Sequence, residues 1–86
     1  MMQSIEGLLV DRSGRPVADA TLSIVQATAP VADIAMMTDG SGRFYLDDLP
    51  SGRFRLQVMP PDGSGQTTVD FAVPRANGLL RIQLDR

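Results

Sequence analysis

Apolar and polar residues alternate with a period of two in this sequence, and that period constrains the fold more than any other feature. In residues 53–59, the apolar side chains Phe54, Leu56 and Val58 alternate with polar neighbours. Successive side chains on a β-strand point to opposite faces, so strict alternation is typical of a strand with one buried face. The sequence therefore predicts seven short strands and no helix longer than one turn. The other alternating runs are residues 4–10, 20–25, 43–49, 68–73 and 79–84, with a weaker one at 33–38.

Clusters of Gly, Pro, Asp and Ser separate these runs. Two of the clusters repeat one string, Asp-x-Ser-Gly-Arg, at residues 11–15 and 39–43. Glycine adopts positive φ without strain, and Asp or Ser side chains bond to the nearby backbone, so each string predicts a chain reversal. We expect Gly14 and Gly42 to take the backbone through these two reversals. Turns about every 8–12 residues between short alternating strands are typical of an all-β sandwich or barrel.

The stretch from residue 44 to residue 53 holds two turn signals close together. We interpret it as a strand of only about four residues, a corner at Leu49–Pro50 and a glycine turn, which is typical of a sheet edge. Asp47 and Asp48 are adjacent within this stretch. Neighbours on a strand point to opposite faces, so we expect no converging acid–base pair from these carboxylates.

Length and composition bound the class of protein. Eighty-six residues without cysteine predict one small domain over residues 1–86 that no disulfide stabilises. The net charge is −2, and the eight basic residues are arginines scattered along the chain rather than clustered, so we expect no nucleic-acid partner. No apolar run approaches the ~20 residues of a membrane-spanning helix, and the first residues lack the features of a signal peptide. We expect no membrane insertion, and a cytoplasmic protein unless the chain is cut from a longer surface protein.

The residue types that most catalytic sites need are missing. The sequence contains no Cys, His or Lys, which excludes thiol catalysis, a histidine base, a Ser–Lys pair and the usual zinc ligands. The glycine-rich stretches at 39–42 and 61–65 carry one Asp each, whereas a calcium loop supplies several oxygen ligands. We expect no enzyme activity, no catalytic residue, no bound metal and no cofactor.

The order of turns and strands resembles the carboxypeptidase regulatory-like domain, which belongs with the transthyretin-like (prealbumin-like) and collagen-adhesin B-type sandwiches. The resemblance covers residues 5–58 in detail and 66–84 by strand pattern alone. It implies a seven-stranded Greek-key β-sandwich, with the first, fourth and seventh strands in one sheet and the other four in the second. In that arrangement, Phe44, Phe54 and Phe71 should lie between the sheets. The positions that carry the resemblance are Gly7, Asp11, Gly14, Pro16, Val17, Ala20, Thr38, Asp39, Gly42, Phe44, Leu49, Pro50, Gly52 and Phe54.

Residues on which specialised branches of this superfamily depend are absent from the chain. The branch that hydrolyses a purine-pathway ureide carries histidines and a Tyr-Arg-Gly-Ser tail, whereas this chain ends in Arg-Ile-Gln-Leu-Asp-Arg. The branch with an internal isopeptide bond joins a Lys to an Asn, and here Asn77 has no Lys to meet. Starch-binding modules share the general architecture but stack sugars on Trp or Tyr, and Tyr45 is the single such residue in the chain.

These observations favour a non-enzymatic structural or protein-binding accessory module. The alternative is an adaptor domain of a secretion or cell-surface assembly that recognises a cargo protein, and a carbohydrate-binding module comes third. The partner would be another protein, a neighbouring domain or a second copy of the chain.

Apolar residues on the outward side of the strands mark the candidate contact face. Leu8, Tyr45 and Leu79 are predicted to point outward from the same sheet, and tyrosine is favoured in interfaces because it combines an apolar body with a polar tip. Val10 is expected to point outward as well, because it alternates with Leu9. The face of the other sheet that carries Val25 and Met37 is the second candidate.

Overall fold

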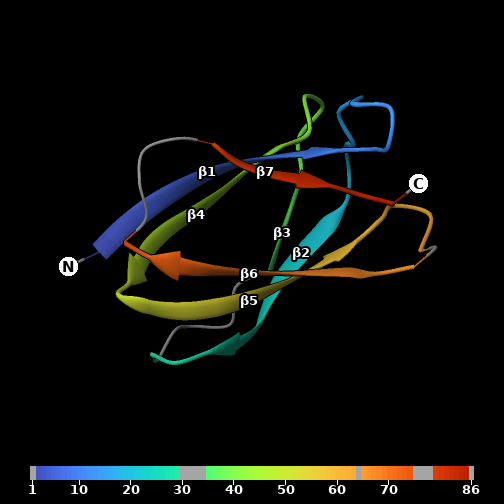
Figure 1. Cartoon of the computed structure of the whole chain (residues 1–86). Helices are drawn as coiled ribbons and strands as arrows, with labels where there is room; N and C mark the ends of the chain where they lie inside the picture. The colour runs from blue at the N-terminus through green and yellow to red at the C-terminus, as the bar shows by residue number, and fades with distance from the viewer. Residues whose placement is uncertain (1, 30–34, 64, 75–78, 86) are drawn as a thin grey trace.

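The computed structural model describes residues 2–29, 35–63, 65–74 and 79–85. Within these residues the chain forms seven strands and no helix (Figure 1). The predicted all-β class and its seven strands are therefore confirmed. The strands are β1 (Met2–Val10), β2 (Thr21–Ala27), β3 (Ala35–Met37), β4 (Arg43–Pro50), β5 (Gly52–Met59), β6 (Thr67–Val73) and β7 (Leu80–Gln83).

The strands form two sheets that pack against each other (Figure 1). Three strands pair in the order β4-β1-β7 and four in the order β3-β2-β5-β6. The β1–β7 pair is parallel, and every other pair is antiparallel. This division of strands is the one that the family resemblance implied, so the predicted transthyretin-like β-sandwich is confirmed.

The core lies between the sheets and consists of the inward-facing residues of the alternating runs. Phe44, Phe54 and Phe71 all belong to it, as predicted. The rings of Phe54 and Phe71 stack with their centroids 5.4 Å apart, a separation typical of favourable aromatic pairs. The other core residues are Ile5, Leu9, Ala20, Leu22, Leu46, Leu49, Leu56, Val58, Val73, Leu80, Ile82 and Leu84.

A glycine on β1 makes room for one of these rings. Gly7 pairs with Phe44 across the β1–β4 ladder. A Cβ atom on Gly7 would overlap the Phe44 ring, so the ring packs directly on the glycine backbone. Glycine in a strand often marks such a close approach.

Strand β4 is longer than predicted, and Leu49–Pro50 is part of it rather than a corner. The strand runs for eight residues, and Gln3 and Met2 of β1 pair with Leu49 and Pro50. The register shifts between Gln3 and Ile5, where β4 holds one extra residue. Asp48 lies in this bulge with a positive φ of 56°. Leu46 and Leu49 are three residues apart, so strict alternation would place them on opposite faces. The extra residue of the bulge keeps both buried, and the pairing with β1 continues beyond it.

Val10 is buried, although alternation with Leu9 predicts that it points to the outer side of its sheet. It is only 2% exposed, and Leu9 beside it faces the core. The turn after β1 brings Pro16 back to pair with Val10, and the Leu84 N–H donates to the Val10 carbonyl over 2.8 Å. Neighbouring chain therefore covers the end of this strand on its outer side as well.

The weak run at 33–38 forms a strand of three residues, Ala35–Met37. Ile34 lies outside the described residues, and Met36 packs against the core. Thr38 follows the strand and is buried, with its hydroxyl donating to the Val17 carbonyl (2.7 Å) and accepting from the Ala20 N–H (3.0 Å). The side chain thus takes the place of a ladder partner where β3 ends.

The repeated Asp-x-Ser-Gly-Arg strings fold into two turns of the same design. In each, the Asp carboxylate accepts from the backbone N–H groups two and four residues further on, which are those of Ser13 and Arg15 in the first turn. Gly14 and Gly42 have positive φ, as expected. A Cβ on Gly42 would lie 2.7 Å from the Leu9 carbonyl oxygen, so close packing as well as φ requires glycine there.

Candidate protein-contact face

The strand register arranges the outward side chains of the small sheet in rows. Tyr45 on β4 lies opposite Glu6 on β1, and Arg43 lies opposite Leu8. On the other side of Leu8 comes Arg81 of β7. Tyr45 is 50% exposed, Leu79 is 36% exposed and Leu8 is partly buried. This mixed apolar and charged surface, made by Glu6, Leu8, Arg43, Tyr45, Leu79 and Arg81, is called the outer face of the small sheet below.

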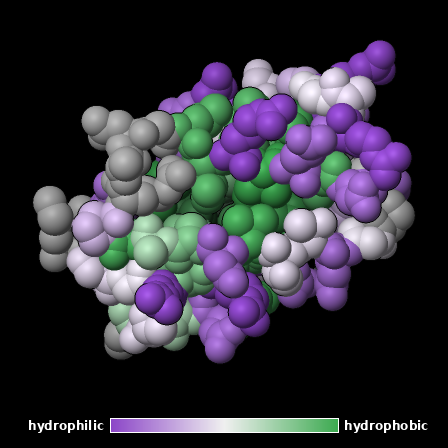
Figure 2. Space-filling view, in the orientation of Figure 1, coloured by the Kyte–Doolittle hydropathy of each residue, from purple (hydrophilic) through white to green (hydrophobic). Residues whose placement is uncertain are grey.

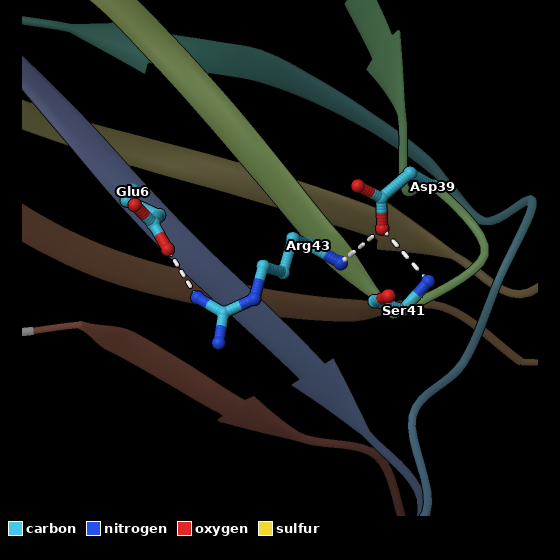
Figure 3. A network of polar contacts seen from close by, with 4 residues as sticks. All are labelled: Glu6, Asp39, Ser41 and Arg43. Atoms are coloured by element: carbon cyan, nitrogen blue, oxygen red, sulfur yellow. Dashed lines mark hydrogen bonds and ion pairs between the residues drawn. The ribbon is translucent and has the colours of Figure 1, made fainter.

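An ion pair links β1 and β4 on this face. The Arg43 guanidinium donates to the Glu6 carboxylate, while the Arg43 backbone N–H donates to Asp39 in the preceding turn (Figure 3). The ion pair runs diagonally across the two strands, because Glu6 lies opposite Tyr45 and Arg43 lies opposite Leu8. Its side chains are 41% and 45% exposed, so it contributes little to stability but presents both charge signs beside Tyr45.

Leu8 and Tyr45 lie on neighbouring strands of the same sheet, as predicted, but the residue directly opposite Tyr45 is Glu6 rather than Leu8. Strand β4 is at the edge of the sheet, as expected from the sequence. Half of the Tyr45 surface is exposed, so no described loop covers its ring completely. Leu79 comes immediately before β7, whose first residue, Leu80, takes the inward position.

The outer face of the larger sheet holds the second predicted pair. Val25 and Met37 are 50% and 58% exposed. Met59, which the sequence reasoning missed, is 42% exposed and pairs with Thr21, which also pairs with Met37. The signal for Met59 was present, because it follows the inward Val58 in the strict alternation of β5.

A groove of about 600 Å³ crosses the same sheet at the end where β2 finishes and β5 begins. Arg55 and Asp70 form an ion pair in it, with 2.9 Å between Nε and Oδ1. The hydrogen bond from Arg55 lowers the pKa of the Asp70 carboxyl. The Arg53 guanidinium makes no ion pair or hydrogen bond with a side chain in the described part of the chain. The residues lining the groove are Gln26, Ala27, Thr28, Arg53, Phe54, Arg55, Asp70, Phe71 and Ala72.

Asp11, Asp47 and Asp48 carry carboxylates that lie outside the two surfaces described above. Asp47 and Asp48 are both exposed at the bulge of β4, and the expectation that they form no acid–base pair stays a prediction. The Asp11 carboxylate is engaged in its own turn, where hydrogen bonds from the Arg15 backbone and from Ser13 lower its pKa. Among the described residues there is no group of three or more carboxylates that could hold a metal ion.

Comparison with known proteins identifies the family. A model of the carboxypeptidase regulatory-like domain matches residues 4–85, nearly the whole chain. The chain therefore belongs to that family, as its turn and strand order suggested. Its domains are non-catalytic, regulatory-like modules that generally take part in protein interactions or in the attachment of other modules. A search of curated proteins found no significant match.

No helix in the described part of the chain is long and apolar enough to cross a membrane.

Proposed function

We propose that this domain is a non-enzymatic accessory module that binds another protein through the outer face of the small sheet. The observation that carries the proposal is the half-exposed Tyr45 on an edge strand, with Leu8 and Leu79 on the same side of its sheet. Tyrosine is enriched in the centres of protein interfaces, where its ring is buried and its hydroxyl finds a partner.

The charges of the face support specificity of contact. Glu6 and Arg43 stand beside the tyrosine with one charge of each sign. Such charged groups fix the register in which a partner binds. They raise the free-energy cost of binding a wrong partner more than they raise the affinity for the right one. A finer form of the proposal is an adaptor that recognises a cargo protein in a secretion or cell-surface assembly. A carbohydrate platform has less support, because Tyr45 is the one aromatic ring on this face.

Paired substitutions test the proposal. Leu8→Ser with Tyr45→Ser should abolish association with a partner, a neighbouring domain or a second copy, as measured by sedimentation of the purified protein with and without that partner. The melting temperature should change by only a few degrees, because Tyr45 is half exposed and Leu8 lies outside the core cluster. Val25→Ser with Met37→Ser, on the other sheet, is the matched control and should associate normally. Association that survives the first pair undiminished would place the contact elsewhere.

A further inference from the structure

Among the residues that the structure describes, no strand pairs with the outer edge of β6, which lies at one end of the larger sheet. Each sheet has two edge strands, β4 and β7 in one and β3 and β6 in the other. Among them, β3 and β7 have three and four residues, and β4 carries the bulge at Asp48 with two exposed carboxylates. Short length, bulges and charge are devices that block the addition of a further strand. Strand β6 has seven residues and pairs with β5 without a register shift.

The backbone groups that β6 presents at this edge follow from the hydrogen bonds of β5. Arg53 uses both of its backbone groups toward β2, since its N–H donates to the Thr28 hydroxyl and its carbonyl accepts from the Thr28 N–H. In an antiparallel ladder, hydrogen-bonded and non-hydrogen-bonded pairs alternate. Ala72, which lies opposite Arg53, is therefore in a non-hydrogen-bonded pair, and its N–H and carbonyl point away from β5. The same holds for Asp70 and Thr68, two and four residues earlier.

The side chains at these positions leave room for a neighbour. Thr68, Asp70 and Ala72 are all exposed on the outer side of the sheet. Ala72 is small, and beyond it in the same row lies Arg53, whose guanidinium has no side-chain partner among the described residues. The groove reaches two of these positions, because its lining runs from β2 across Arg53 and Arg55 to Asp70 and Ala72. Two arginines and one aspartate line the groove, so its lining carries one net positive charge.

The inner side of the same edge is apolar. Hydrophobic residues gather in the middle of Figure 2, in the region that β6 and β7 frame in Figure 1. Phe71 of β6 and Leu80 of β7 are the most exposed members of the core, at 8% and 9%. A strand added beside β6 would cover this part of the core with its own inward side chains.

We propose that the free edge of β6 binds an extended, acidic segment of a partner protein by strand addition. The segment pairs with the backbone groups of Thr68, Asp70 and Ala72 and packs apolar residues beside Phe71. An Asp or Glu opposite Ala72 reaches across the small alanine to the Arg53 guanidinium in the groove. Main-chain hydrogen bonds supply affinity in this mode of recognition, and the alternating side chains supply specificity. The inference rests on the proposed protein-binding role but uses the opposite sheet, so the two can fail separately.

Amide hydrogen exchange with a model peptide tests the inference. The probe is a short peptide of alternating Thr and Val with a central Glu, blocked at both ends, and its matched control carries Lys in place of Glu. We expect the Glu peptide to slow exchange of the Thr68, Asp70 and Ala72 amides. It should bind about fivefold more tightly than the Lys peptide, because opposite charges at an exposed site contribute modestly. Protection at β4 or β7 instead, equal binding of the two peptides, or no binding of either would overturn the inference. If the same amides became protected as the protein concentration rose, without any peptide, the occupant of the edge would be a second copy of the chain and the inference would be overturned.

Substitutions separate the backbone and the charge contributions. Thr68→Pro removes an N–H that points away from β5, so the fold should persist while peptide binding is lost, and Thr68→Ala should bind normally. Arg53→Ala should abolish the preference for Glu, Arg53→Lys should retain most of it, and Arg81→Ala on the other sheet should not change it. Leu8→Ser with Tyr45→Ser should leave peptide binding unchanged, whether or not it abolishes contact at the small sheet. Loss of peptide binding in this pair, or unchanged binding in Thr68→Pro, would contradict strand addition at β6.

Discussion

Single residues set the limits of close packing in this small domain, and Gly7 is the strictest case. Its backbone lies against the Phe44 ring, which is 1% exposed. Gly7→Ala should therefore lower the free energy of unfolding by about 1–3 kcal/mol, the usual cost of overpacking a core. Urea denaturation measures this value. Gly40→Ala is the control, because a Cβ there meets nothing within 4 Å. Equal stability of the two variants would show that the Phe44 ring does not lie on Gly7.

The carboxylate of Asp11 gives the first turn a dependence on pH. Its pKa lies below the ordinary value of 3.8, because hydrogen bonds from the Arg15 backbone and Ser13 favour the charged form. A carboxyl whose pKa is lower in the folded state adds stability above the pKa of the unfolded chain, and that stability disappears as pH falls through the folded pKa. The free energy of unfolding should thus decrease as the pH is lowered from about 5 toward 2.

Denaturation at several pH values checks this dependence. Asp11→Asn should reduce stability near neutral pH and flatten the loss on acidification, since the amide does not titrate. Asp70 contributes in the same direction through Arg55, so Asp70→Asn should flatten the curve further. Both carboxylates are exposed, so the effects should be small. If the free energy of unfolding fell equally steeply with decreasing pH in the wild type and in both variants, the role assigned to these carboxylates would be contradicted.

The bulge of β4 is the element that most changes the edge of the small sheet. Asp48 adopts positive φ, which Asp tolerates better than a β-branched residue does. Asp48→Val should therefore destabilise the domain by about 1–2 kcal/mol, whereas Asp47→Val, one residue earlier, should have a small effect. Thermal denaturation measures both. If Asp47→Val proved the more harmful change, the extra residue of the bulge would have to lie one position earlier.

The pairing of β5 with β6 provides a test of register. Phe54 is 2% exposed and stacks on Phe71, while Arg55 points outward to Asp70. Phe54→Ala should cost about 3–5 kcal/mol and leave the domain largely unfolded or sharply destabilised, because a domain of this kind has only about 5–15 kcal/mol in total. Arg55→Ala removes an exposed ion pair and should be mild. Circular dichroism during thermal unfolding distinguishes the two, and similar melting temperatures would mean that β5 presents its other face to the core.

At the scale of the whole molecule, local patterns predicted an all-β sandwich or barrel, and the family resemblance implied the sandwich. Neither predicted the details of its edges. Alternation identified the inward residues because side-chain direction on a strand depends only on position. The length of β4 could not be read this way, because its bulge depends on how Asp48 is paired across the ladder with β1. The burial of Val10 was missed for a related reason, since Pro16 pairs with it only after the turn has folded back.

The candidate surfaces were predictable to the same extent. The outward direction of Tyr45 followed from the alternation with Phe44, but the row in which Glu6 faces it required the register. The groove at Arg53 was not foreseen, because it forms from three strands whose alignment the sequence does not state. Fold class is thus carried by short-range periodicity, whereas sites on a sandwich depend on pairing between distant segments.

The most direct test of the central claim, that the outer face of the small sheet contacts a protein, is site-specific photo-crosslinking. A photoreactive amino acid replaces Tyr45 in the protein expressed in its own host, and a second variant carries it in place of Met37 on the opposite sheet. Both positions are at least half exposed, so the two variants sample solvent equally well. The account predicts a discrete crosslinked protein with the first variant, absent with the second and lost when Leu8→Ser is added to the first. A crosslink that forms from position 37 and not from position 45 would contradict it.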